Sequence, residues 1–222
     1  MIPWVQLDTA EIPGGGQLKL MQRGAEYSIM SGAIELMNSR LSGSEKALAS
    51  LACERIAARP APHVLVGGLG MGFTLRAALA DLPASARVTV AELVPAVVAW
   101  ARGPMAHLHG GSLDDPRVTI REGDVADAIR AAPGAYDAIL LDVDNGPGGL
   151  NRDANDSLYA ARGLAEAHRA LKPGGVLAVW SAGPDAGFTR RLQSAGYRSE
   201  EHQVRATGGR RGARHVIWLA TR

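Results

Sequence analysis

The chain has 222 residues, of which 46% are hydrophobic and 21% are charged, and it carries a formal net charge of +2 and one cysteine. These values are ordinary for a globular protein, and one cysteine excludes an internal disulfide or a multi-cysteine zinc site. We expect no metal site. No apolar run approaches the roughly 20 residues that span a bilayer, and the charge gives no reason to expect nucleic acid as a partner. The N-terminus lacks a basic segment followed by an apolar one, so we expect a cytoplasmic protein.

The first forty residues predict a short β unit. Polar and apolar residues alternate, in part, at 17–23 and 26–30 on either side of Gly24, a pattern typical of antiparallel strands. A helix is predicted to begin at Ser42, with Glu45 three residues later completing a capping box. We therefore divide the chain into an N-terminal β unit at 1–41 and a catalytic, cofactor-binding unit at 42–222.

The larger unit alternates strands with helices. The pattern predicts a strand beginning at Val64 and others at 87–92, 117–124, 136–142 and 176–180, with helices between them, including one at 157–171. Two β segments at 197–205 and 215–220 close the chain and predict an antiparallel hairpin. The fold class is therefore α/β: a doubly wound, Rossmann-like, mostly parallel sheet with a C-terminal hairpin.

A glycine-rich turn follows the first strand of this unit. Gly68, Gly70 and Gly72 allow a sharp turn and the close approach of a ligand to the backbone at the start of a helix. We interpret this turn, with Met71 inside it, as a loop that binds a nucleoside-containing cofactor. The alternative is an ordinary tight turn in an α/β protein.

The next two strands end at carboxylates. Glu92 lies about twenty residues beyond the glycine turn, where it can accept hydrogen bonds from ribose hydroxyls. Asp124 can accept one from the exocyclic amine of adenine. Either residue alone fits a solvated loop acid, but their joint spacing favours a cofactor site that also includes the adjoining Leu93 and Val125.

These features together resemble one enzyme family. The glycine turn, the two acidic strand ends, an aspartate ending the fourth strand and a Leu-Lys-Pro-Gly-Gly turn are similar to the class I S-adenosylmethionine-dependent methyltransferase fold. Within that fold the chain resembles spermidine synthases. The more specific segments are Val66–Arg76, Asp115–Val118, Asp142–Pro147 and Leu158–Tyr159.

The resemblance implies roles for particular residues. Spermidine synthases bind decarboxylated S-adenosylmethionine, and their ribose-binding and adenine-binding acids match Glu92 and Asp124. Their catalytic aspartate, which orients and deprotonates the attacking amine, matches Asp142, and Asp144 lies near the second aspartate of the family. The resemblance also implies a homodimer. A carboxylate suits this chemistry because it can hold a cationic amine and accept its proton.

Four further residues are candidates for binding a small-molecule acceptor. Asn145 lies in a glycine-rich segment that we expect to close over the substrate, the alternative being an ordinary connection, and Tyr159 belongs to the matched Leu-Tyr segment. Trp180 and Ser181 end the fifth strand, on the side where doubly wound sheets bind ligands. The alternative for Trp180 is a core aromatic residue.

Two departures from the family guide the choice of reaction. Met71 occupies the position of an aspartate that contacts the amine end of the decarboxylated cofactor or substrate, so intact S-adenosylmethionine becomes admissible. The segment 44–50 corresponds to a family motif that helps form the polyamine groove, but it keeps only the first glutamate of that motif, Glu45, and lacks its tyrosine. We therefore expect S-adenosylmethionine as cofactor and transfer of a methyl or related alkyl group to an acceptor near Asp142 and Asp144. The alternatives are an aminopropyltransferase that uses decarboxylated S-adenosylmethionine, and a non-catalytic nucleoside-binding protein.

Overall fold

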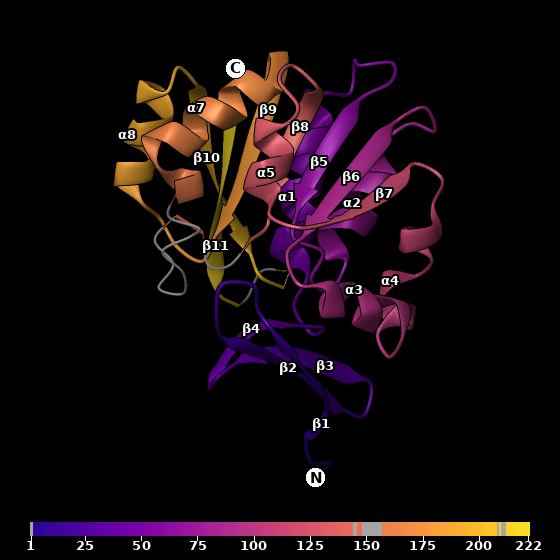
Figure 1. The fold of residues 1–222 in the computed structure, drawn as a ribbon. Coiled ribbons are helices and arrows are strands. Elements are labelled where there is room, and N and C mark those ends of the chain that lie inside the picture. The colour runs from indigo at the N-terminus through magenta and orange to yellow at the C-terminus, as the bar shows by residue number, and fades with distance from the viewer. Residues whose placement is uncertain (1, 144–145, 148–156, 208, 210–211) are drawn as a thin grey trace.

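The computed structural model describes residues 2–143, 146–147, 157–207, 209 and 212–222. It contains two sheets, with the smaller one lying beyond one end of the larger (Figure 1). The smaller sheet has four antiparallel strands in chain order, namely β1 Val5–Glu11, β2 Gln17–Arg23, β3 Glu26–Ser31 and β4 Ile34–Asn38. Gly24, at φ +59°, turns the chain between β2 and β3, as its position predicted.

The larger sheet has seven strands in the order β10-β11-β9-β8-β5-β6-β7. The strands β5 to β9 run parallel to one another, whereas β11 pairs antiparallel with both β9 and β10. This confirms the predicted mostly parallel sheet with a terminal hairpin. The bounds are β5 His63–Gly67, β6 Arg87–Glu92, β7 Val118–Glu122, β8 Tyr136–Leu141, β9 Leu171–Ser181, β10 Arg198–Arg205 and β11 Arg214–Thr221.

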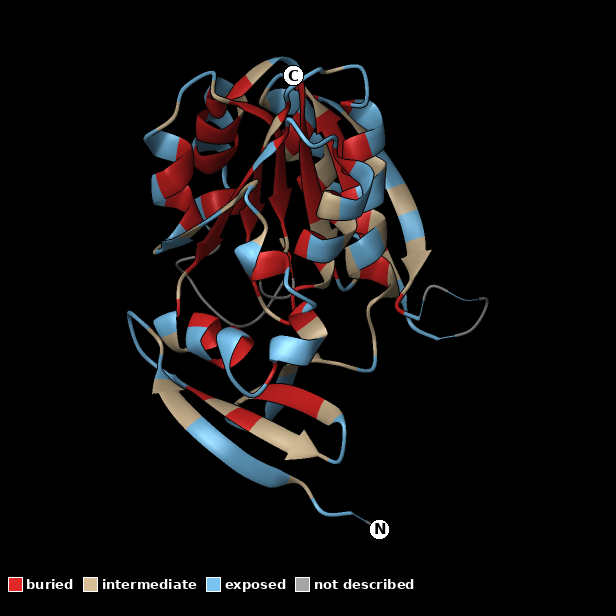
Figure 2. Ribbon diagram, turned by 90° about the vertical axis from the view of Figure 1, so that its right-hand side faces the viewer, coloured by how far each residue is buried: buried red, intermediate tan, exposed pale blue. Residues whose placement is uncertain are grey.

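Helices cover both faces of the larger sheet. Along β5 the side chains of Val64 and Val66 pack into one hydrophobic cluster with α1, α2 and α3, whereas Leu65 packs into the other with α5, α7 and α8. Figure 2 shows the buried strands between these layers. The helices are α1 Gly43–Arg55, α2 Phe73–Asp81, α3 Pro95–Arg102, α4 Ala106–His109, α5 Val125–Arg130, α7 Ala161–Ala170 and α8 Ala186–Ser194, with a 3₁₀ turn η1 at Ser112–Asp114.

Two helix predictions need correction. Ser42 is the N-terminal cap of α1, but its side chain makes no capping hydrogen bond, and Glu45 bonds instead to the hydroxyl of Ser44. The predicted helix at 157–171 is interrupted, because Ala160 has an extended backbone with ψ 167° and α7 begins only after it. The Lys-Pro-Gly-Gly turn predicted after that helix is also different, because it lies within the long strand β9.

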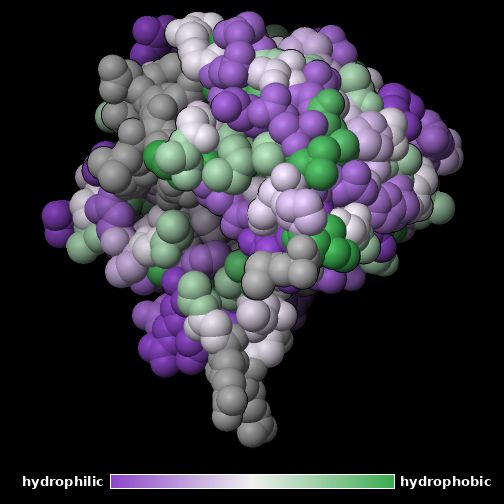
Figure 3. Space-filling model, turned by 90° about the horizontal axis from the view of Figure 1, so that it is seen from below, coloured by the Kyte–Doolittle hydropathy of each residue, from purple (hydrophilic) through white to green (hydrophobic). Residues whose placement is uncertain are grey.

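The smaller sheet is attached to the larger one at the edge where the parallel strands end. The indole of Trp100 in α3 donates a hydrogen bond to Asp8 of β1 at 2.6 Å, and Met37 of β4 lies against the glycine turn after β5. A view from below the molecule shows apolar side chains among hydrophilic ones (Figure 3). In the part of the chain that the structure describes, the large apolar side chains that remain exposed are Ile2, Val5, Leu7 and Ile34. Among the described residues, no helix is both long and apolar enough to cross a membrane.

Candidate functional site

A cavity of about 810 Å³ opens between the smaller sheet and the ends of the parallel strands. Its floor is the switch point of the larger sheet, where chain order reverses between β5 and β8 and where doubly wound folds bind their ligands. The smaller sheet contributes the opposite wall through the Gly14–Gly16 turn and the strand β4. The cavity is large enough for a nucleoside-sized cofactor with a small second substrate.

The glycine turn after β5 lines this cavity and has the predicted sharp geometry. Gly68, Gly70 and Gly72 all have positive φ angles, of +88°, +49° and +78°. A Cβ on Gly68 would lie 2.5 Å from the carbonyl oxygen of Asp142. Only glycine, which has no Cβ, therefore allows the turn to come so close to the end of β8. The three glycines therefore let the turn pack closely against its protein neighbours while it lines the cavity.

Glu92 ends β6 and connects the glycine turn to α3. One carboxylate oxygen accepts a hydrogen bond from the amide of Leu69, and the other accepts one from the amide of Val94, each at 2.9 Å. Burial raises the pKa of Glu92, and these backbone amides oppose that rise. The amides of Gly70 and Leu93 also oppose the rise in this pKa, so the backbone around the carboxylate fixes its orientation at the end of β6.

Asp124 follows β7 and caps α5. Its Oδ1 accepts a hydrogen bond from the amide of Ala126 at 2.8 Å, so the side chain is oriented by the helix that it begins. The residue is exposed and lines the cavity together with Val125, while Glu92 and Leu93 line it from the neighbouring strand end. The structure therefore brings the predicted nucleoside-binding residues to one site.

Asp142 lies directly after β8, on the floor of the same cavity. Its Oδ2 accepts a hydrogen bond from the hydroxyl of Thr74, in the first turn of α2, at 2.5 Å. Burial, together with the negative charge of Glu45, raises the pKa of Asp142 to about 7, although the bond from Thr74 opposes this rise. A carboxylate with such a pKa can accept a proton near neutral pH.

The predicted acceptor-binding residues have different outcomes. Trp180 lines the cavity, and its indole nitrogen is buried without a hydrogen-bond partner among the described residues. Tyr159 and Ser181 are not among the described residues that line it. The Tyr159 hydroxyl donates to the carbonyl of Val143 at 3.3 Å, and Ser181 is 3% exposed. Asp144 and Asn145 lie outside the described residues.

Sequence reasoning missed Met37 and His215, which line the cavity from the small sheet and from the terminal hairpin. Glu45 also lines it, and the resemblance to the family had matched this residue to the first glutamate of a polyamine-groove motif. Met37 lies over the glycine turn, with its sulfur 3.0 Å from where a Cβ on Gly70 would be. No local motif marks Met37 or His215, because they reach the site through tertiary packing.

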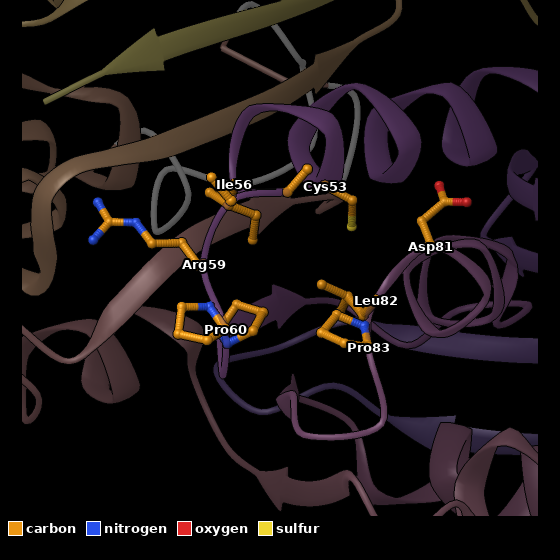
Figure 4. A pocket seen from close by; sticks show the side chains of 10 residues that line it. Cys53, Ile56, Arg59, Pro60, Asp81, Leu82 and Pro83 are labelled. Atoms are coloured by element: carbon orange, nitrogen blue, oxygen red, sulfur yellow. The ribbon is translucent and has the colours of Figure 1, made fainter.

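A second hollow of about 440 Å³ lies away from this site, between the ends of α1 and α2. Figure 4 shows the thiol of Cys53 and the side chains of Leu82 and Pro83 facing it from opposite sides. Burial raises the pKa of Cys53 to about 12, so this thiol is a poor nucleophile. No group of three or more His, Cys, Asp or Glu side chains among the described residues is arranged to hold a metal ion.

Residues 47–184, which are more than half of the chain, match the model of the spermine/spermidine synthase domain. The chain belongs to this family. It is 34% identical over 154 residues to a polyamine aminopropyltransferase of Mycobacterium tuberculosis, and 32% identical over 153 residues to polyamine aminopropyltransferase 1 of Streptomyces coelicolor. Each match covers 65% of this chain but only 28% of the relative. A shorter stretch of 115 residues, 51% of this chain and 28% of the relative, is 36% identical to putrescine N-methyltransferase 4 of Nicotiana tabacum.

Solved structures confirm the fold class. A spermidine synthase from Thermotoga maritima superposes with a TM-score of 0.76 at 20% identity, covering 97% of this chain and 72% of that structure. The spermine/spermidine synthase family membership confirms the resemblance inferred from the residues and supports the expectation of a transferase. The expectation that methyl transfer is the main activity is wrong by these comparisons, because the family model and the two bacterial relatives favour aminopropyl transfer.

Proposed function

We propose that this spermine/spermidine synthase family member binds decarboxylated S-adenosylmethionine and transfers its aminopropyl group to a primary amine of a small polyamine precursor. The observation that carries this proposal is the position of Asp142. Its carboxylate, which can accept a proton, lies on the floor of a nucleoside-sized cavity beside the glycine turn. The acids Glu92 and Asp124 line the same cavity. The names of the bacterial relatives support the same reaction.

The residues present fit such a cofactor. Gly68 lets the glycine turn lie close to the backbone of Asp142, and Glu92, held by backbone amides, lines the same cavity. Asp124 is fixed by its capping bond at the other strand end. The cofactor supplies an electrophilic carbon next to a sulfonium, and the protein supplies binding and orientation.

Asp142 is the residue that we assign to the reaction itself. An ammonium group has no free lone pair, so the attacking amine must lose a proton before or as its nitrogen bonds to the aminopropyl carbon. Asp142 accepts that proton as the carbon–nitrogen bond forms and the carbon–sulfur bond breaks. The leaving thioether is neutral and needs no acid, so orientation and exclusion of water supply the rest of the acceleration.

The test is turnover of the purified protein with decarboxylated S-adenosylmethionine and putrescine, measured by release of methylthioadenosine and by the mass of the polyamine product. We expect transfer by the wild-type protein and a loss of about 10² to 10⁴-fold in kcat for Asp142→Asn. Binding of methylthioadenosine, measured by calorimetry, should be similar in both proteins. Nucleoside binding without transfer to any amine would contradict the proposal and leave a non-catalytic binding protein.

A further inference from the structure

A buried histidine with two unpaired ring nitrogens lies against the glycine turn. His109, the last residue of the short helix α4, is 1% exposed. Neither of its ring nitrogens has a hydrogen-bond partner among the described residues. Burying a polar group without a partner is costly, so the contacts of this ring call for an explanation.

The ring packs against Gly72, the last glycine of the turn. A Cβ on Gly72 would lie 2.7 Å from Cε1 and 3.2 Å from Cγ of His109, so a residue with a Cβ would collide with the ring. Gly72 lines the cavity, whereas His109 is not among the described residues that line it. The imidazole therefore supports the turn from outside the cavity.

Gly72 also begins the helix that contacts Asp142. It is the N-terminal cap of α2, and its carbonyl accepts a hydrogen bond from the amide of Arg76 at 3.0 Å. Two residues after Gly72, the hydroxyl of Thr74 donates to Asp142. A displacement of Gly72 would therefore disturb both the glycine turn and the residue that bonds to Asp142.

The helix that carries His109 is attached on two sides. The guanidinium of Arg76 donates a hydrogen bond to the carbonyl of Leu108 at 2.7 Å, which connects α2 to α4. The ring of His107 meets the ring of Tyr27 in β3, with centroids 5.4 Å apart. Figure 1 shows α4 beside α3, next to the smaller sheet. These contacts fix the position from which His109 reaches Gly72.

The surroundings of the ring favour its neutral form. Burial lowers the pKa of His109 to about 4, and the charges of Arg76 in α2 and His107 in α4 add to this effect. Among the described residues, no carboxylate forms an ion pair with His109. A proton on the ring would thus place a positive charge in an apolar pocket near Arg76.

We propose that His109 is a positioning residue for the cofactor site: its neutral ring holds Gly72 and the start of α2 in place, and protonation of the ring releases them. The inference rests on the proposed function only for the identity of the ligand, a nucleoside that carries a sulfonium or thioether. A protonated ring is better solvated outside its pocket, so the open arrangement takes up a proton that the closed one disfavours. Acid should therefore loosen the turn without unfolding the larger sheet.

Hydrogen exchange measures this release directly. The ring titrates near pH 6.5 when it is free and near pH 4 when it is packed, so acid stabilises the open form. We expect the protection of the Arg76 amide to fall about tenfold or more between pH 7 and 5, after correction for the intrinsic exchange rate. His109→Phe keeps a ring against Gly72 but gains no proton, so its protection should not fall in this way.

Low concentrations of urea separate a local release from unfolding of the whole protein. The Arg76 amide should exchange at a rate that urea does not change, because local opening exposes little surface. The amide of Leu140, in the buried strand β8, should exchange faster as urea is added. The same urea dependence at Arg76 and Leu140 would overturn the proposal, and so would an equal loss of protection with acid in the wild type and in His109→Phe.

Removal of the ring tests the positioning role. His109→Ala leaves Gly72 without this contact, so we expect the affinity for methylthioadenosine at pH 7 to fall about tenfold, with a matching rise in the KM for decarboxylated S-adenosylmethionine and a smaller change in kcat. His109→Phe should restore most of the affinity, because the ring holds the turn and its nitrogens do not.

Phe188→Ala is the control for a general loss of stability. It removes a fully buried ring from the other hydrophobic cluster, so it should lower the free energy of unfolding without weakening nucleoside binding. Unchanged affinity in His109→Ala would overturn the positioning role. An equal loss of affinity in Phe188→Ala would also overturn it, since the effect would then follow stability alone.

Failure of the proposed function is a separate outcome. The exchange experiment needs no substrate, so it tests His109 even if the wild-type protein transfers no aminopropyl group. Loss of protection at Arg76 with acid in the wild type but not in His109→Phe would support the release in that case as well. Transfer by the wild type without this loss of protection would support the proposed function and overturn the role of His109.

Discussion

The hydroxyl of Thr74 and the carboxylate of Asp142 are joined by a hydrogen bond of 2.5 Å, which connects the first turn of α2 to the end of β8. This bond favours the charged form of Asp142, whereas burial and the nearby charge of Glu45 favour the neutral form. The balance leaves the pKa of Asp142 at about 7. Its protonation state is therefore sensitive to small changes in its neighbours.

The first prediction is that the rate of transfer depends on pH, and that one limb of the pH profile reports the ionisation of Asp142. Asp142 accepts a proton only when ionised, so kcat/KM should rise with pH through about 7, on top of the ionisation of the amine itself. Thr74→Val removes a bond to the charged form and should move this limb to higher pH. Glu45→Gln removes a like charge and should move it to lower pH.

These profiles are measured between about pH 5 and 9 with saturating cofactor. Asp142→Asn is the control, because its residual activity retains only the ionisation of the amine substrate. A wild-type limb that coincides with that of Asp142→Asn, or that does not move in the Thr74 and Glu45 variants, would show that Asp142 does not control the reaction.

The second prediction concerns stability. The pKa of Asp142 is 3.8 for an ordinary aspartate and about 7 in the fold, so the folded protein binds this proton more tightly than the unfolded chain. The free energy of unfolding contributed by Asp142 is therefore highest at low pH and is lost as pH rises from about 4 to 7. Above pH 7, Asp142→Asn should be more stable than the wild type by on the order of 1 kcal/mol.

Urea unfolding at pH 8 and at pH 4 checks this sign. The stabilisation by Asp142→Asn should be present at pH 8 and largely absent at pH 4, which is close to the pKa of 3.8 of an ordinary aspartate and well below the value of about 7 in the fold. A variant that is less stable than the wild type at pH 8 would mean that the ionised carboxylate stabilises the fold.

The sequence predicted the fold well because its signals are local. One apolar run followed by closely spaced glycines marks β5 and its turn. Parallel strands place their carboxyl ends at one edge of the sheet, which brings Glu92, Asp124 and Asp142 together. Met37 and His215 were missed because they reach the cavity from β4 and β11, and nothing in a single sequence records that packing. The prediction of methyl transfer weighted two departures, Met71 and the missing tyrosine of the segment 44–50, above the family resemblance.

The third prediction separates two costs of replacing a glycine. Gly72 has φ +78°, and an added Cβ would lie 2.3 Å from Nδ1 of the buried His109 ring. Gly134 has φ +64° but open space around it. Gly134→Ala should therefore lower the free energy of unfolding only by the cost of a left-handed backbone at a residue with a Cβ, about 1 to 2 kcal/mol. Gly72→Ala should lower it by a further amount of about 1 to 3 kcal/mol, because the added Cβ overpacks against His109.

Chemical denaturation of the two variants measures this difference. In the His109→Ala background the extra cost of Gly72→Ala should disappear, because the ring that a Cβ would meet is gone. Equal costs at Gly72 and Gly134 in the wild-type background would mean that the turn moves away from His109 without strain.

The fourth prediction concerns the choice between the two forms of the cofactor. Met71 lines the cavity within the glycine turn and brings no charge to it. Met71→Asp places a carboxylate there, which attracts the free ammonium of the decarboxylated cofactor and repels the carboxylate of intact S-adenosylmethionine. We expect the ratio of affinities to move about tenfold or more toward the decarboxylated form. Met71→Asn is the control, because it loses the same packing without adding a charge. Calorimetry with both cofactors decides the question: if the aspartate and asparagine variants change the two affinities in parallel, Met71 fills space and has no part in cofactor selection.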